Sequence, residues 1–260
     1  MSSLLLHIGG LAREQVRDAL PKPNRFEEPW ATFNRTALST PPLGQRHQSN
    51  PPRLALYFPR PEIVPNVRPG TYRYTRDPTA PADAPAKSSL STDASVWSIP
   101  HDDARAILES QLLSLRLRSR GIVGSPTPNP KNLPPQPRRI YLVGGGSQNA
   151  AIAKITGEIL AGVEGVYKLD VGGNACALGS AYKAVWACER KEHETFEDLI
   201  GARWDEEGSV EKIAEGYQDK KYKIYEKGVE GLEAVEEDVL EKQRLDVGKA
   251  GTSGAERPAA

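Results

Sequence analysis

A strand that runs directly into three glycines is the clearest place for chemistry in this sequence. In RRIYLVGGGSQNAAI, an apolar run at 140–143 is followed by glycines at 144–146 and then by a helix-forming segment. Glycines at a strand-to-helix turn let a ligand approach the backbone, and the N–H groups at a helix start favour phosphate or ribose oxygens. A tight turn needs one glycine. Three glycines followed by Ser147 and Asn149 therefore favour a ligand-binding turn over a purely structural one.

This turn matches neither of two common phosphate-binding motifs. A P-loop requires Gly-Lys-Ser or Gly-Lys-Thr after the glycines, and neither follows here. A dinucleotide-binding fingerprint requires a third glycine where this sequence has Asn149, and no acidic residue stands clearly at the ribose position. The turn therefore calls for a different nucleotide-binding geometry.

Carboxylates and histidines elsewhere do not form a recognisable catalytic group. Asp102 and Asp103 lie at an expected helix start, where pairing with the helix dipole explains them. Asp170 ends an expected strand, but nothing beside it in the sequence suggests a metal partner. His101 precedes a helix and His193 lies in the charged run KEHE, as surface histidines commonly do. We assign none of them a catalytic role and expect no metal site.

The composition argues against several classes of function. The 260 residues contain 34 Lys+Arg and 34 Asp+Glu, so zero net charge gives no electrostatic reason to expect nucleic acid or an anionic membrane. Cys176 and Cys188 supply neither a disulfide framework nor a zinc spacing, and we interpret them as reduced thiols. The apolar run at 4–6 is too short for a signal peptide or a membrane span. We therefore expect a cytoplasmic protein.

Strands and helices are expected to alternate along the chain. Apolar runs predict strands at 4–8, 54–58, 140–143 and 166–171. Helical spacing predicts helices at 11–20, 102–120, 150–160 and 175–191, with a tight turn at Gly9 and Gly10 and an amphipathic helix at 102–120. Residues 210–243 predict one or two surface helices interrupted near Gly228 and Gly231. Such alternation is typical of an α/β domain.

Proline and small residues gather in three segments between or after these elements. Residues 76–100, rich in Ala, Pro, Ser and Thr, predict a mobile surface insertion, and 121–137 predict a Pro-rich connector. Residues 245–260 are small and polar and predict a disordered tail. We therefore expect one folded domain over residues 1–244 that carries Pro-rich loop insertions.

Six motifs, in this order, resemble the C-terminal half of eukaryotic xylulose kinases of the FGGY group of sugar kinases. They are LAREQVRD (11–18), PWATFN (29–34), LALYFPRPEIVPNV (54–67), RAILESQLLSLRLRS (105–119), VGGGSQN (143–149) and NACALGSAYKA (174–184). The strand, the glycine pair and the serine before a helix also resemble the adenosine motif of the actin-like ATPase fold. Six motifs in one order, from about residue 11 to 241, make a specific resemblance.

The resemblance implies a fold, a reaction and a nucleotide site. The fold is an α/β domain of the actin-like ATPase (ribonuclease H-like) kind, and the reaction is ATP-dependent phosphorylation of D-xylulose to D-xylulose 5-phosphate with Mg2+. The implied nucleotide-binding residues are Trp30, Gly144, Gly145 and Asn149. An indole can stack against adenine, and an asparagine offers it both a donor and an acceptor. Gly179 is expected to allow close helix packing beneath the nucleotide.

The resemblance covers only the nucleotide half of such a kinase. The family binds its sugar mainly with an N-terminal domain that also supplies the aspartate general base, and we expect that domain to be absent here. Two hypotheses follow. The chain is the ATP-binding half of a xylulose kinase, weakly active or inactive alone, with ATP and D-xylulose as substrates; or it is a non-catalytic nucleotide-binding or interaction protein. The cleft face left exposed also predicts self-association.

Overall fold

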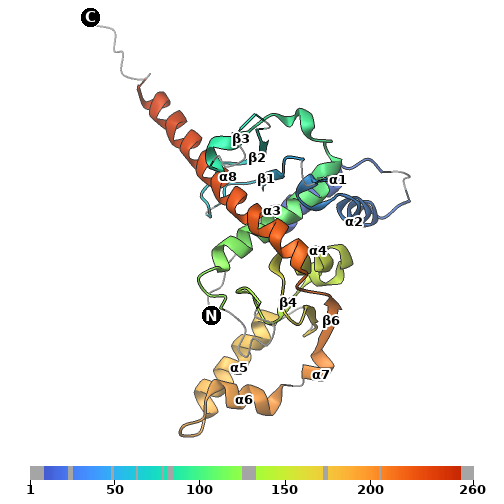
Figure 1. The fold of residues 1–260 in the computed structure, drawn as a ribbon. Coiled ribbons are helices and arrows are strands. Elements are labelled where there is room, and N and C mark those ends of the chain that lie inside the picture. Colours follow the sequence, from blue (N-terminus) through green and yellow to red (C-terminus); the bar gives the residue numbers. More distant parts are fainter. Residues whose placement is uncertain are drawn as a thin grey trace, which may run out of the picture.

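The computed structural model of this chain describes residues 9–22, 26–47, 50–62, 64–77, 79–80, 85–124, 133–171, 175–204 and 206–252. Within this part of the chain, α1, α2, α4, α8 and the first of two small sheets pack around α3, and the second sheet packs on α4 (Figure 1). Three predicted segments lie partly or wholly outside the described residues. They are the strand expected at 4–8, residues 125–132 of the Pro-rich connector, and residues 253–260 of the expected tail.

An antiparallel sheet in the order β1-β2-β3 and two short helices form the first half. Its elements are α1 (Gly9–Ala19), α2 (Pro29–Ser39), η1 (Pro42–Gly44), β1 (Arg53–Phe58), β2 (Gly70–Arg76), η2 (Lys87–Ser89), β3 (Leu90–Ser91) and η3 (Ala94–Val96). The turn expected at Gly9 and Gly10 is wrong, because α1 begins at Gly9. Residues 85–100, part of the expected insertion, add a strand to this sheet and bury Trp97 in the core, which their composition did not predict.

α3 (His101–Ser119) confirms the predicted helix but is not amphipathic. It is buried on several sides because α1, α2, α4, α8 and β1 all contact it. Its first acidic residues bind strand side chains: Asp102 accepts a hydrogen bond from Arg53, and Asp103 accepts from Tyr57 (2.6 Å) and Arg73 (2.6 Å). Pairing with the helix dipole is therefore an incomplete account of Asp102 and Asp103.

A second, mixed sheet follows α3. Its elements and the helices beside it are β4 (Ile140–Leu142), η4 (Gly145–Gln148), α4 (Ala150–Leu160), β5 (Val166–Leu169), α5 (Ala175–Glu189), α6 (Phe196–Arg203), α7 (Glu206–Ser209) and β6 (Val210–Ala214). β4 pairs with β5 in parallel, and β6 pairs antiparallel with β5. α4 packs against this sheet. The helix predicted to begin at residue 210 is wrong there, because Val210–Ala214 is a strand.

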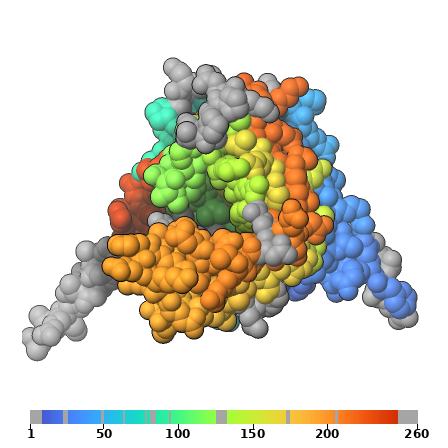
Figure 2. Space-filling view, turned by 90° about the horizontal axis from the view of Figure 1, so that it is seen from below, coloured from blue at the N-terminus to red at the C-terminus, as the bar shows by residue number. Residues whose placement is uncertain are grey.

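α5 and α6 stand out from the rest of the molecule. Figure 2, viewed from below, shows them as an orange lobe in front of the other elements. α5 is rich in apolar residues, yet none of its residues is buried. A Cβ placed at Gly179 would meet nothing within 4 Å among the described residues. The expectation that Gly179 permits close helix packing is therefore wrong for the part of the chain described.

The helix α8 (Asp219–Thr252) is part of the core. It buries Tyr225, Val229, Leu232, Val235 and Val239 against α3, β1 and η1. The predicted interruption near residues 228 and 231 is wrong, since the helix is continuous through both glycines and extends past residue 244, where we expected the folded part to end. These glycines instead admit neighbouring side chains at close range.

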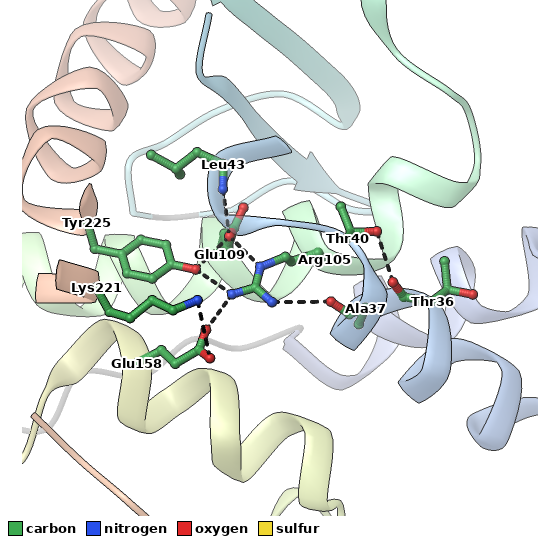
Figure 3. Close-up of polar contacts among 9 residues, drawn as sticks. All are labelled: Thr36, Ala37, Thr40, Leu43, Arg105, Glu109, Glu158, Lys221 and Tyr225. Atoms are coloured by element: carbon green, nitrogen blue, oxygen red, sulfur yellow. Dashed lines mark hydrogen bonds and ion pairs between the residues drawn. The ribbon is translucent and has the colours of Figure 1, made fainter. Parts of the chain in front are cut away.

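Buried charges join four helices on one side of α3 (Figure 3). Arg105 donates to Glu109 (2.8 Å), to Glu158 of α4 (2.5 Å), to the hydroxyl of Tyr225 (2.7 Å) and to the carbonyl oxygen of Ala37 in α2 (3.3 Å). Each of the three charged residues is at most 5% exposed. The guanidinium therefore ties α2, α3, α4 and α8 together.

Burial governs protonation in this cluster. It raises the pKa of the Glu109 carboxyl, although Arg105 and the backbone N–H of Leu43 act in the opposite direction. Burial also raises the pKa of the Tyr225 hydroxyl well above its usual value, and the charge of Glu109 adds to the effect. Removing the Arg105 guanidinium would leave the buried carboxylates of Glu109 and Glu158 without the positive charge that stabilises them.

Candidate nucleotide site

The glycine turn lies between β4 and α4, where the sequence predicts it. Gly144 has φ +77° and ψ −160°, a conformation that favours glycine. The turn continues as the short helix η4 and is held by Ser147, whose side chain is buried. The hydroxyl and the backbone N–H of Ser147 both donate to the carbonyl oxygen of Gly144, at 2.7 and 3.0 Å. A rigid turn therefore precedes the helix.

Two of the three glycines are not explained by the conformation or packing of the turn. A Cβ built on Gly144, Gly145 or Gly146 would meet no other described residue beyond its chain neighbours within 4 Å, and of the three only Gly144 has a positive φ. A larger side chain could therefore occupy Gly145 or Gly146 without a clash among the described residues. The exposed surface at these glycines allows a ligand to approach the backbone of the turn closely.

Asn149 is the N-cap of α4, and both the oxygen and the nitrogen of its amide form hydrogen bonds. Its Oδ1 accepts from the backbone N–H groups of Ala151 (3.0 Å) and Ile152 (3.1 Å). Its Nδ2 donates to Oδ1 of Asn34 at 2.8 Å. Capping and the bond to α2 thus use both ends of the side chain that was predicted to pair with adenine.

Trp30 lies in the first turn of α2 and is half-buried. Its ring packs against the core, edge-on to Phe33 with the ring centroids 5.3 Å apart. The guanidinium of Arg17 lies 4.8 Å from the Trp30 ring centroid, which is the geometry of a cation–π contact. Asn34 follows Trp30 by four positions, so both residues lie on one face of α2.

The hydrogen bond between Asn149 and Asn34 thus links the glycine turn to the helix that carries Trp30. Trp30 and Asn34 share a face of α2, Asn34 bonds to Asn149, and Asn149 directly follows the glycine turn. Neither Asn34 nor Arg17 was predicted as a site residue. The spacing of Trp30 and Asn34 within PWATFN was an available signal for Asn34, whereas nothing near Arg17 in the sequence pointed to the indole.

Other candidate residues do not gather into a second site. Asp170 forms an ion pair with Lys168 (2.8 Å), and His101 and His193 are exposed. Cys176 and Cys188 are exposed and free. Across the described residues, no three His, Cys, Asp or Glu side chains are grouped to hold a metal ion. The helices in that same part of the chain include none with the length and apolarity needed to span a membrane.

Comparison with known proteins finds carbohydrate kinases both by family model and by sequence identity. Residues 2–188 match the family model described as the FGGY family of carbohydrate kinases, C-terminal domain. The chain is 57% identical over 237 residues to "Probable D-xylulose kinase A" of Aspergillus fumigatus, covering 90% of this chain. It is 56% identical over 238 residues, again 90% of this chain, to "D-xylulose kinase A" of Aspergillus niger. These matches confirm the resemblance and the fold class predicted from the motifs.

The matched region is a minor part of each relative. The chain spans 40% of the length of both Aspergillus proteins. Among solved structures, the xylulose kinase from Rhodospirillum rubrum is similar with a TM-score of 0.49 and 19% identity, over 87% of this chain and 37% of that one.

Proposed function

This chain belongs to the FGGY family of carbohydrate kinases, and from that premise we propose that it binds an adenine nucleotide at the turn 144–149. The observation that carries the proposal is the unfilled space at Gly145 and Gly146, which neither packing nor backbone conformation requires. Backbone N–H groups at such a turn and at the start of α4 suit the oxygens of a nucleotide.

We further infer that the chain supplies the nucleotide side of an ATP-dependent kinase for D-xylulose. In that reaction a sugar hydroxyl attacks the γ-phosphorus of ATP, ADP leaves, and the hydroxyl proton passes to a base. Mg2+ would be held mainly by the phosphates of the nucleotide, as such ions commonly are, in keeping with the lack of a three-residue metal cluster in the described part. We propose that the base and the sugar contacts belong to the part of the relatives that this chain does not span.

Calorimetric titration with Mg·ADP tests the nucleotide site. Gly145→Val would fill the open space at little structural cost, because Gly145 has no close neighbour and no positive φ. We expect it to weaken binding at least tenfold. Gly201→Ala is the matched control, since Gly201 in α6 is likewise exposed and without close neighbours. A folded wild-type chain that does not bind Mg·ADP, or a Gly145→Val chain that binds equally well, would refute the proposal.

A phosphorylation assay with D-xylulose tests whether the chain catalyses the reaction by itself. Turnover by the purified chain would show that it is an active kinase by itself. Binding of Mg·ADP without turnover is expected both of a kinase half that is inactive alone and of a non-catalytic nucleotide-binding protein. Cytoplasmic location and self-association remain predictions. The exposed apolar α5 favours self-association, and a monodisperse monomer in light scattering would contradict it.

A further inference from the structure

We propose that Asn34 is a positioning residue of the nucleotide site: its Oδ1 holds the amide of Asn149 so that the second N–H of Asn149 faces the nucleotide. This inference rests on the proposed function, because it adds a residue to the same site. The contact between Asn149 and the nucleotide is what the family resemblance implies, whereas the role of Asn34 follows from the structure. Three hydrogen bonds of the Asn149 amide carry the argument.

Two kinds of contact fix the Asn149 amide. Only an oxygen can accept from backbone N–H groups, so the atom that accepts from Ala151 (3.0 Å) and Ile152 (3.1 Å) is Oδ1. These capping bonds fix the oxygen but not the direction of the nitrogen. The bond from Nδ2 to Oδ1 of Asn34, at 2.8 Å, fixes that direction as well.

One hydrogen of the Asn149 amide remains. Nδ2 carries two hydrogens, and Asn34 accepts one of them. Because an amide group is planar, the second N–H has one direction once Oδ1 and Nδ2 are both held. Asn149 is half-buried and directly follows the glycine turn, in which Gly144 and Gly145 are exposed. A nucleotide at this turn can supply an acceptor to that N–H, since purine ring nitrogens and ribose oxygens both accept hydrogen bonds.

The acceptor on α2 is itself held in place. Ala37, which follows Asn34 by three positions, is buried, and its carbonyl oxygen accepts from Arg105. Arg105 also donates to Glu158 of α4. Two links therefore join α2 to α4, one through Arg105 and one through the bond between Asn34 and Asn149. Asn34 can thus orient the donor before a ligand binds, which lowers the cost of binding.

Calorimetric titration of single and double variants with Mg·ADP tests this role. Asn34→Leu keeps a side chain of similar size but offers Asn149 no acceptor. Asn149→Ser keeps an oxygen that caps α4 but has no amide N–H to be held. Neither change alters the charge near the phosphates. Thermal unfolding shows whether each variant is folded, and Asn34→Ala serves in place of Asn34→Leu if leucine disturbs the helix.

We expect Asn34→Leu to weaken Mg·ADP binding at least fivefold in a chain that is still folded at the temperature of the titration. In the Asn149→Ser background the same substitution should change binding less than twofold, because no amide N–H remains to be held. Thr36→Val is the matched control: it removes a half-buried polar group from the same helix and leaves the bond to Asn149 intact. It should bind Mg·ADP like the wild type.

Three results would overturn the inference. The first is an Asn34→Leu chain that binds Mg·ADP like the wild type. The second is an Asn34→Leu substitution that weakens binding by the same factor in both backgrounds, since a merely structural role of Asn34 would not depend on the Asn149 amide. The third is wild-type affinity of Asn149→Ser, because Asn149 would then make no contact that needs to be positioned.

The failure of this inference can be told apart from failure of the proposed function. If the wild type binds Mg·ADP and Gly145→Val weakens that binding, the nucleotide site stands. An unaffected Asn34→Leu chain would then refute only the role of Asn34. If the folded wild type does not bind Mg·ADP, both fail together.

Discussion

Replacing Arg105 with methionine tests the energetic role of the buried charge cluster. The change keeps most of the side-chain volume but removes four hydrogen bonds and leaves Glu109 and Glu158 buried, the latter with Lys221 at 3.6 Å. Breaking a buried ion pair from one side costs about 3–5 kcal/mol. Since domains are stable by about 5–15 kcal/mol, Arg105→Met should remove a large share of the stability.

Urea unfolding measures this loss. With a slope of about 2 kcal/mol per molar urea, the unfolding midpoint of Arg105→Met should fall by about 1.5–2.5 M at unchanged slope. Adding Glu109→Gln should restore about 1–2 kcal/mol, because the amide removes the uncompensated charge. Arg120→Met is the control: its pair with Glu233 is exposed and 3.4 Å long, and should contribute less than about 1 kcal/mol. A cost below about 1 kcal/mol for Arg105→Met would refute the reasoning.

Two further substitutions have defined outcomes. Gly231→Ala would place a Cβ 2.5 Å from Cδ1 of the buried Leu54, and should lower the free energy of unfolding by about 1–3 kcal/mol in urea unfolding. Gly228→Ala is the comparison: its Cβ contacts would be 3.3 Å or more, so it should be nearly neutral. Equal effects of the two substitutions would contradict this account. Hydrogen bonds from two arginines lower the pKa of Glu164, so its contribution is present above the unfolded pKa near 4.5 and lost as the pH falls through the folded value. Glu164→Gln should therefore lower the melting temperature at pH 7, and this loss should shrink as the pH falls below about 4.5. A loss that does not change with pH would argue against it.

The sequence predicted well those helices and strands that are marked by neighbouring residues, such as a capping side chain or an apolar run. The helix α4 was predicted at residues 150–160 and lies there because Asn149 caps it and its apolar residues recur at helical spacing. The strands at 54–58 and 140–143 were predicted from their apolar runs, and β1 and β4 confirm them to within one residue. Such elements depend little on distant parts of the chain.

Elements that depend on distant partners were predicted poorly. β6 contains Glu211 and Lys212, and its sequence predicts a helix, but it is a strand because it pairs with β5. α8 was expected on the surface because it is rich in Glu and Lys, yet its apolar face covers β1 and α3. Neither the sheet pairing nor the packing of Gly231 against Leu54 can be read from neighbouring residues.

The candidate site also combines local features, which the sequence predicted, with a distant contact, which it did not. The glycine turn and the cap at Asn149 are local features, so the sequence indicated their positions. The partner of Asn149 is separated from it by 115 positions, and its contact exists only because α2 packs against α4. Sequence spacing could relate Asn34 to Trp30, but it could not relate either residue to the glycine turn without a resemblance to known kinases.

The position of α8 in the core also constrains how the chain is synthesised and folded. The apolar faces of β1 and α3 are completed by Tyr225 to Val239, which follow them in the chain after the whole second sheet. Contacts between such distant segments form slowly. A nascent chain that has not yet released α8 therefore exposes these surfaces, and a product that ends before Tyr225 would be a substrate for chaperones and proteases and prone to aggregate.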